Sequence, residues 1–217
     1  MNEFAAIRTI GSTAISTPPG PDALRSFLRD HTAESHARLD NRFGAFAGPR
    51  TVESYRRFVA MNLLAHRALS AFFTDARVSA ATPLQTSVRT NLMHLEADRA
   101  AMDLDCATAC EFFVETLGAA EIAGLTYVLD GSRLGARFIH RRLEKAGALD
   151  SQGGEASARF LRSAFDRDGA GPHGIETPGA DVETKERALA AALATFALFE
   201  RCLDRIVAHE VGKEPSR

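Results

Sequence analysis

His36 is the residue whose type and surroundings point most directly to chemistry. It recurs at helical spacing with Leu28, Thr32 and Leu39, so we expect it to face the interior of the fold. A neutral imidazole nitrogen in such a place can bind the iron of a haem. A single histidine on an apolar stripe is more often a hydrogen-bonded core residue, so the interpretation depends on its neighbours.

Two charged neighbours favour the ligand interpretation. Asp40 lies four residues after His36, where its carboxylate could accept the second ring N–H and fix the tautomer. Arg29 lies seven residues before His36, about 10.5 Å along the helix axis, which suits a cation that binds a haem propionate. The alternative for both is a solvated charge. His31 is a second candidate ligand, but it lies about 140° around the helix from His36.

Three glycines interrupt the segment GLTYVLDGSRLGARFIHRRL, residues 124–143, without breaking its helical period. Gly124, Gly131 and Gly135 are spaced seven and four residues apart and therefore share one face. Each costs a helix interior about 1 kcal/mol relative to alanine. Close contact with another helix would explain this cost, and so would a flat ligand lying against bare backbone. The spacing alone leaves both explanations open.

The pattern along the rest of the chain predicts an all-α fold. We expect a flexible arm at residues 1–19, one helical domain at 20–209 and a tail at 210–217. The apolar periods and the Gly and Pro punctuation predict helices at about 22–44, 51–73, 84–99, 107–117, 119–146, 155–166 and 182–209, with a loop at 166–181. We find no alternating strand pattern and no repeat, which favours helix-on-helix packing.

Composition and motifs exclude several classes of function. The formal net charge is -2, so no broad basic surface is available for nucleic acid. No stretch approaches the roughly 20 apolar residues of a membrane helix, and the N-terminus does not resemble a secretory signal, so we expect a cytoplasmic protein. The chain has no HExxH, no paired CxxC and no GxSxG motif, which leaves zinc and serine-hydrolase chemistry without support.

Two segments together resemble the bacterial haem oxygenases, especially the branch found with bacterial phytochromes. LRDHTAESHARLD, residues 28–40, resembles their proximal helix, and YVLDGSRLGAR, residues 127–137, resembles their distal helix. SYRRFVAMNLLAHRALSAFF, residues 54–73, and ATFALFERCLD, residues 194–204, are similar to the second and last helices. The resemblance covers most of residues 24–205. It implies a single-domain haem-oxygenase-like helical bundle with a kinked distal helix.

The resemblance also implies a set of site residues. His36 matches the proximal iron ligand, with Asp40 behind it, and Arg29 matches the basic residue that meets a propionate. The matches to the distal, catalytic positions are Gly131, Ser132 and Gly135, with the serine ordering distal water.

Further haem-binding positions implied by the resemblance are Tyr127, Ala136, Arg159 and Arg162. Ala136 replaces a usual glycine, and its extra methyl group would crowd the distal pocket. Arg159 or Arg162 would supply the second propionate contact. Phe165 stands where a tyrosine is usual.

The reaction implied by the resemblance is the oxidation of haem, by O2 and external electrons, to biliverdin, carbon monoxide and ferrous iron. Haem would be both cofactor and substrate. The chain has no flavin or nicotinamide fingerprint, so a reductase or ferredoxin would be the electron donor, and a bacteriophytochrome would be a candidate recipient of biliverdin. Two alternatives stay open, namely a haem-binding sensor or carrier without turnover, and a helical interaction module that binds no haem.

Overall fold

The computed structural model describes residues 22–43, 51–75, 83–106, 110–149, 157–165 and 180–212. The elements are α1 (Asp22–Asn41), α2 (Thr51–Thr74), α3 (Pro83–Ala101), α4 (Ala119–Lys145), α5 (Arg159–Ser163) and α6 (Val182–Val211). Within these ranges there is no strand, and the predicted all-α class is confirmed. The predicted arm, residues 1–19, lies outside the described residues.

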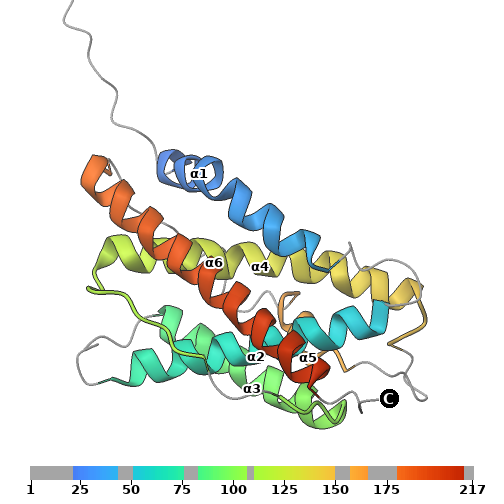
Figure 1. Ribbon diagram of the computed structural model, residues 1–217. Helices are drawn as coiled ribbons and strands as arrows, with labels where there is room; N and C mark the ends of the chain where they lie inside the picture. Colours follow the sequence, from blue (N-terminus) through green and yellow to red (C-terminus); the bar gives the residue numbers. More distant parts are fainter. Residues whose placement is uncertain are drawn as a thin grey trace, which may run out of the picture.

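The last helix is the element around which the others are arranged. In Figure 1, α6 runs diagonally across the molecule, with α1 above it and α2 and α3 below. It packs most extensively against α4 and also contacts α1 and α2, while α3 packs against α2 and α5. Helix α1 contacts α4 much less than it contacts α6. The two helices that carry the predicted iron ligand and the predicted distal glycines are therefore held mainly through α6, which leaves space between them.

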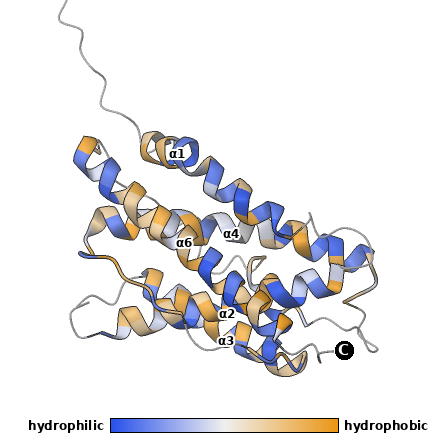
Figure 2. Ribbon diagram, viewed as in Figure 1, coloured by the Kyte–Doolittle hydropathy of each residue, from blue (hydrophilic) through white to orange (hydrophobic). Residues whose placement is uncertain are grey.

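Helix α1 buries only a narrow stripe. Leu24, Leu28, Thr32 and Ser35 are buried, at spacings of four, four and three residues. Figure 2 shows that much of the remaining surface of α1 is hydrophilic. The buried stripe faces α6, against which α1 packs. A helix attached along one stripe leaves the residues beside that stripe free to line a neighbouring cavity.

Small residues bring α4 and α6 into close contact. A Cβ atom placed on Gly124 would lie 2.1 Å from the carbonyl oxygen of Ala188 and 3.0 Å from the backbone nitrogen of Ala192. Both alanines are fully buried. The N-terminal half of α4 therefore needs a residue without a side chain at this position, because α6 backbone occupies the space.

The predicted helix at 107–117 is wrong over its described residues 110–117, which form an irregular segment. Cys110 and Phe112 are buried, whereas the side chain of Phe113 is 70% exposed. Burial that alternates between neighbouring residues is the two-residue period of extended backbone. The segment crosses from the end of α3 to the start of α4 (Figure 1). The two phenylalanines that suggested a helix point in different directions.

Helix α5 is shorter than the predicted helix at 155–166. The buried carboxylate of Asp98 accepts hydrogen bonds from the backbone N–H groups of Arg159 and Phe160, each at 2.9 Å, and from the Ser157 hydroxyl at 2.7 Å. The Tyr55 hydroxyl donates to the carbonyl of Ser157 at 2.7 Å, and burial raises the pKa of Tyr55. These bonds fix the start of α5 against α2 and α3 by satisfying donors that a helix start leaves unpaired.

Candidate functional site

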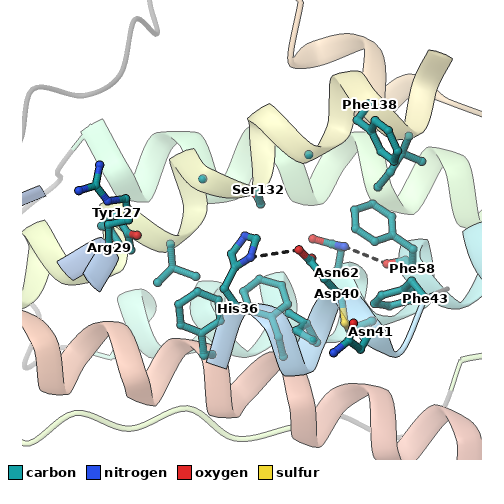
Figure 3. A pocket seen from close by; sticks show the side chains of 18 of the residues that line it. Arg29, His36, Asp40, Asn41, Phe43, Phe58, Asn62, Tyr127, Ser132 and Phe138 are labelled. Atoms are coloured by element: carbon teal, nitrogen blue, oxygen red, sulfur yellow. Dashed lines mark hydrogen bonds and ion pairs between the residues drawn. The ribbon is translucent and has the colours of Figure 1, made fainter. Parts of the chain in front are cut away.

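A cavity of about 1170 Å³ lies between α1, α2, α4 and α6. Pockets for small ligands usually measure about 300–1,000 Å³, so this one accepts a large molecule. The predicted site residues from α1 and α4 stand on its walls, among them His36, Asp40, Gly131, Ser132 and Gly135. Figure 3 shows the His36 ring rising from α1 into the space below α4, beside Ser132. Residues 95 positions apart in the chain thus share one cavity.

The His36 ring is oriented by its own helix. Its Nδ1 lies 3.1 Å from Oδ2 of Asp40, four residues later, and its ring meets the edge of Phe196 at 6.0 Å between centroids. When neutral imidazole donates its Nδ1 proton to Asp40, Nε2 carries the lone pair. This geometry favours one tautomer and leaves Nε2 free to accept a bond, which is also the arrangement of histidines that bind metals.

His36 was expected to face the interior of the fold, and the structure places it on the cavity wall and not within the packed stripe of α1. Its side chain is 57% exposed. It follows Ser35, the last buried residue of the stripe, and one residue turns the side chain by about 100° around the helix. The histidine therefore stands beside the packed stripe and opens into the cavity.

The three glycines on one face of α4 have two different surroundings. Among the described residues outside the adjacent turns of α4, a Cβ on Gly131 or Gly135 would meet no atom within 4 Å, whereas one on Gly124 would collide with α6. Both explanations for the glycines therefore apply, each to a different part of the helix. The wall opposite His36 is formed in part by bare backbone next to open space.

Ser132 lies on the same wall. Its hydroxyl donates a 2.6 Å hydrogen bond to the carbonyl of Leu129 in its own helix. The hydroxyl proton is thereby occupied, and the oxygen retains lone pairs that can accept a hydrogen bond. Ser132 can therefore hold a water or another donor in the cavity.

One end of the cavity is cationic. Arg29 lines it with a side chain that is 70% exposed and pairs with the adjacent Asp30 at 3.1 Å. The Tyr127 hydroxyl lies 3.5 Å from the hydroxyl of Thr32, which places it at the same part of the wall. Arg25, a residue that our sequence analysis did not select, also lines the cavity. Its spacing of four residues from Arg29 could have identified it.

The other end of the cavity is apolar and aromatic. Phe43 and Phe58 contact each other edge to face at 5.7 Å, and Ile139 completes this part of the wall with Phe138. In Figure 3, Phe43, Phe58 and Phe138 lie at the side opposite Arg29 and Tyr127. Sequence analysis missed these residues, because phenylalanines at helical spacing look the same whether they fill a core or line a cavity.

Asn62, which lines the cavity, and the buried His66 form a polar pair on α2. The Asn62 amide donates to the carbonyl of Phe58 at 2.9 Å, and His66 Nδ1 lies 2.8 Å from the carbonyl of Asn62. Burial lowers the pKa of His66 to about 4. The imidazole is therefore neutral at pH 7 and adds no charge next to the cavity.

Three predicted haem-binding residues are not among the described residues on the cavity wall. Ala136 is 1% exposed and turned about 100° from Gly135, so its methyl group packs into the core and does not crowd the cavity. Arg159 and Arg162 are exposed on α5, which packs against α3 and α4. The structure thus does not bring either arginine to the place predicted for the second propionate contact.

Phe165 also lies away from the described cavity wall. Its ring meets the edge of the His140 ring at 5.2 Å, and the Arg137 guanidinium lies 5.5 Å from its centroid. Arg137 also donates to the carbonyl of Ala164 at 3.1 Å. The phenylalanine thus helps to attach the end of α5 to α4.

Comparison with solved structures finds a match over most of the chain. No protein-family model matches the chain, and no curated protein matches it. The crystal structure of the NO- and CO-bound haem oxygenase from Neisseria meningitidis matches 85% of this chain and 92% of its own chain, with a TM-score of 0.59 and 21% identity. The chain has the haem oxygenase fold. At this identity the likeness concerns the fold, which agrees with the predicted helical bundle. None of the described helices is long and apolar enough to cross a membrane.

Proposed function

We propose that the chain is a haem oxygenase, which converts haem with O2 and external electrons to biliverdin, carbon monoxide and ferrous iron. The observation that carries this proposal is the arrangement of His36 opposite the side-chain-free stretch at Gly131 and Gly135 in one large cavity. The haem oxygenase fold supports it.

The walls fit a haem in three respects. The cavity is large, and the open space at both glycines allows a flat ring to approach the backbone of α4. The aromatic end suits the apolar edge of a porphyrin. The end with Arg29 suits its carboxylates, since guanidinium groups bind carboxylates through paired hydrogen bonds.

His36 would hold the iron through Nε2, while Asp40 keeps the proton on Nδ1 and raises the basicity of the ring. Bound haem supplies the iron at which O2 is reduced and the ring that is cut. As the ligand, His36 would supply a neutral imidazole nitrogen, which donates less electron density to an iron than a thiolate does. The protein's part on this side is to orient the ligand.

On the opposite side, Gly131 and Gly135 would let a flat ring approach the backbone of α4. Their missing side chains would leave free space on this face of the ring. The oxygen of Ser132 accepts a hydrogen bond from a water and thereby holds a proton donor at this face.

The finer parts of the proposal rest on the sequence resemblance. We propose Arg29 and Tyr127 as propionate contacts, a reductase or ferredoxin as electron donor and a bacteriophytochrome as recipient of biliverdin. Placement in the bacteriophytochrome-associated branch has the same support.

Haem titration followed by turnover tests the proposal. The purified protein should bind one equivalent of haem with a sharp Soret band, and ascorbate in air should bleach this band and yield a bile pigment. A Soret band that persists under these conditions would instead favour the sensor or carrier. If no Soret shift occurs, the interaction module is favoured and the proposal is rejected.

A further inference from the structure

Arg25 shares a line on α1 with the two residues that the proposed function already uses. It precedes Arg29 by four residues and His36 by eleven. At 100° per residue, the two arginines lie about 20° to either side of the line through His36. All three residues line the same cavity. Both guanidinium groups therefore belong to the cavity end towards the start of α1.

The charges of both arginines are available to an anion. Arg25 is exposed and forms no ion pair with any of the residues that the structure describes. Arg29 pairs with its sequence neighbour Asp30, whose side chain is 62% exposed. Exposed pairs of this kind contribute little energy and exchange readily with another carboxylate. This cavity end thus offers two cations.

The rest of the cavity restricts where two carboxylates can bind. At the opposite end the described wall is lined by Phe43, Phe58 and Phe138, and no arginine or lysine of the described wall lies there, so a carboxylate would lose part of its hydration without a charged wall residue. Arg142 packs on the Phe138 ring, 5.0 Å from its centroid, and is not among the residues that line the cavity. Arg159 and Arg162, which the resemblance suggested as partners, are absent from the described cavity wall. A ligand with two carboxylates on one edge therefore has one favourable orientation.

We propose that Arg25 is the second carboxylate-binding residue of the cavity and that, together with Arg29, it fixes the in-plane orientation of a porphyrin dicarboxylate. This inference rests on the proposed function. With both carboxylates held, the same edge of the macrocycle always faces the aromatic end. With only one held, the macrocycle can rotate within the cavity.

The binding of a porphyrin carboxylate by Arg25 is tested by comparing the affinities of the protein for two porphyrins. The protein is titrated with ferric haem and with ferric haem dimethyl ester, which has the same ring and no free carboxylate. Arg25→Ala should weaken haem binding by about threefold to fivefold relative to the parent, as expected for an exposed ion pair, and leave the affinity for the ester unchanged. Arg25→Lys should restore most of the loss. Arg89→Ala removes an exposed arginine on α3 and should change neither affinity.

Orientation is tested by proton NMR of the ferric cyanide complex formed with a haem whose two halves are equivalent about the axis between the carboxylates, so that a flip over this axis gives no new resonances and only in-plane rotation does. We expect one set of haem methyl resonances in the parent and in Arg89→Ala, and a second set in Arg25→Ala that disappears in Arg25→Lys.

Equal effects of Arg25→Ala on haem and on the ester would overturn the inference, as would a haem affinity equal to that of Arg89→Ala. A single set of methyl resonances in Arg25→Ala would overturn the orientation role. Each of these outcomes leaves haem binding by the parent, and with it the proposed function, intact. If the parent binds no haem, the proposed function fails as well.

Discussion

Glycine serves two different purposes in two parts of α4, namely close packing against α6 and open space beside the cavity. Gly124, near the start of the helix, lies so close to α6 that a Cβ atom would be 2.1 Å from a carbonyl oxygen, whereas Gly131 and Gly135, further along the helix, adjoin open cavity. The start of the helix also holds Glu121, which accepts two hydrogen bonds from Arg187 of α6 at 2.8 and 3.0 Å. We call the part of α4 around Glu121 and Gly124, which packs on α6, the anchored half, and the part around Gly131 and Gly135, which adjoins the cavity, the bare half.

The largest expected effect concerns the anchored half. Gly124→Ala gains about 1 kcal/mol of helix propensity but must push two backbones apart, so we expect a net loss of about 3 kcal/mol in the free energy of unfolding. Urea denaturation monitored by circular dichroism measures it. Gly131→Ala is the matched control and should be neutral or more stable by up to about 1 kcal/mol. Equal stabilities of the two variants would remove the distinction between the halves.

A bulky residue in the bare half should reduce haem affinity and leave stability unchanged. Gly131→Leu should leave the unfolding free energy close to that of the parent and weaken haem binding about 100-fold, or roughly 2.8 kcal/mol, because its side chain occupies the cavity. Soret titration gives the affinity. If Gly131→Leu binds haem as tightly as the parent, haem does not lie against this part of α4.

The anchored half should also respond to pH. Burial would raise the pKa of Glu121, but the hydrogen bonds from Arg187 and from backbone N–H groups lower it to about 2, against an ordinary value of 4.5. A carboxylate with a lowered pKa stabilises the fold fully above pH 4.5, and this contribution of about 2 kcal/mol disappears as the pH falls through 2.

The measurement is the stability gap between the parent and Glu121→Gln. The gap should be constant from pH 7 to pH 5 and close progressively between pH 4.5 and pH 2. A gap of the same size at every pH would show that the Glu121 charge contributes nothing.

The smallest expected effect concerns Ala136. Its methyl group is buried, and Ala136 is not among the described residues that line the cavity. Ala136→Gly should therefore cost about 1 to 2 kcal/mol of stability, through helix propensity and lost burial, and leave haem affinity unchanged. Thermal unfolding and Soret titration measure the two quantities. A gain in haem affinity would indicate that the methyl group does crowd the pocket.

Long elements could be predicted from the sequence, because apolar residues recur over many turns in α2 and α6. The segment at 110–117 could not, since two adjacent phenylalanines fit a helix until their burial is known. The exposure of His36 was missed for a related reason, as a helical stripe is about 100° wide and its edge is invisible in the sequence.

The candidate site shows a similar division. The positions of His36, Gly131 and Gly135 followed from spacing and resemblance. The different roles of Gly124 and of the other two glycines could not be predicted, because the spacing of glycines does not show whether another helix or a cavity faces each of them. The role of Arg25 at the cavity end depends on the same tertiary information.

The most direct test of the central claim is resonance Raman spectroscopy of the ferrous haem complex, which detects the stretching vibration of an iron–histidine bond. The parent should show this band, and His36→Ala should lack it and regain it when imidazole is added. Retention of the band in His36→Ala without imidazole would contradict the account, because another histidine would then bind the iron.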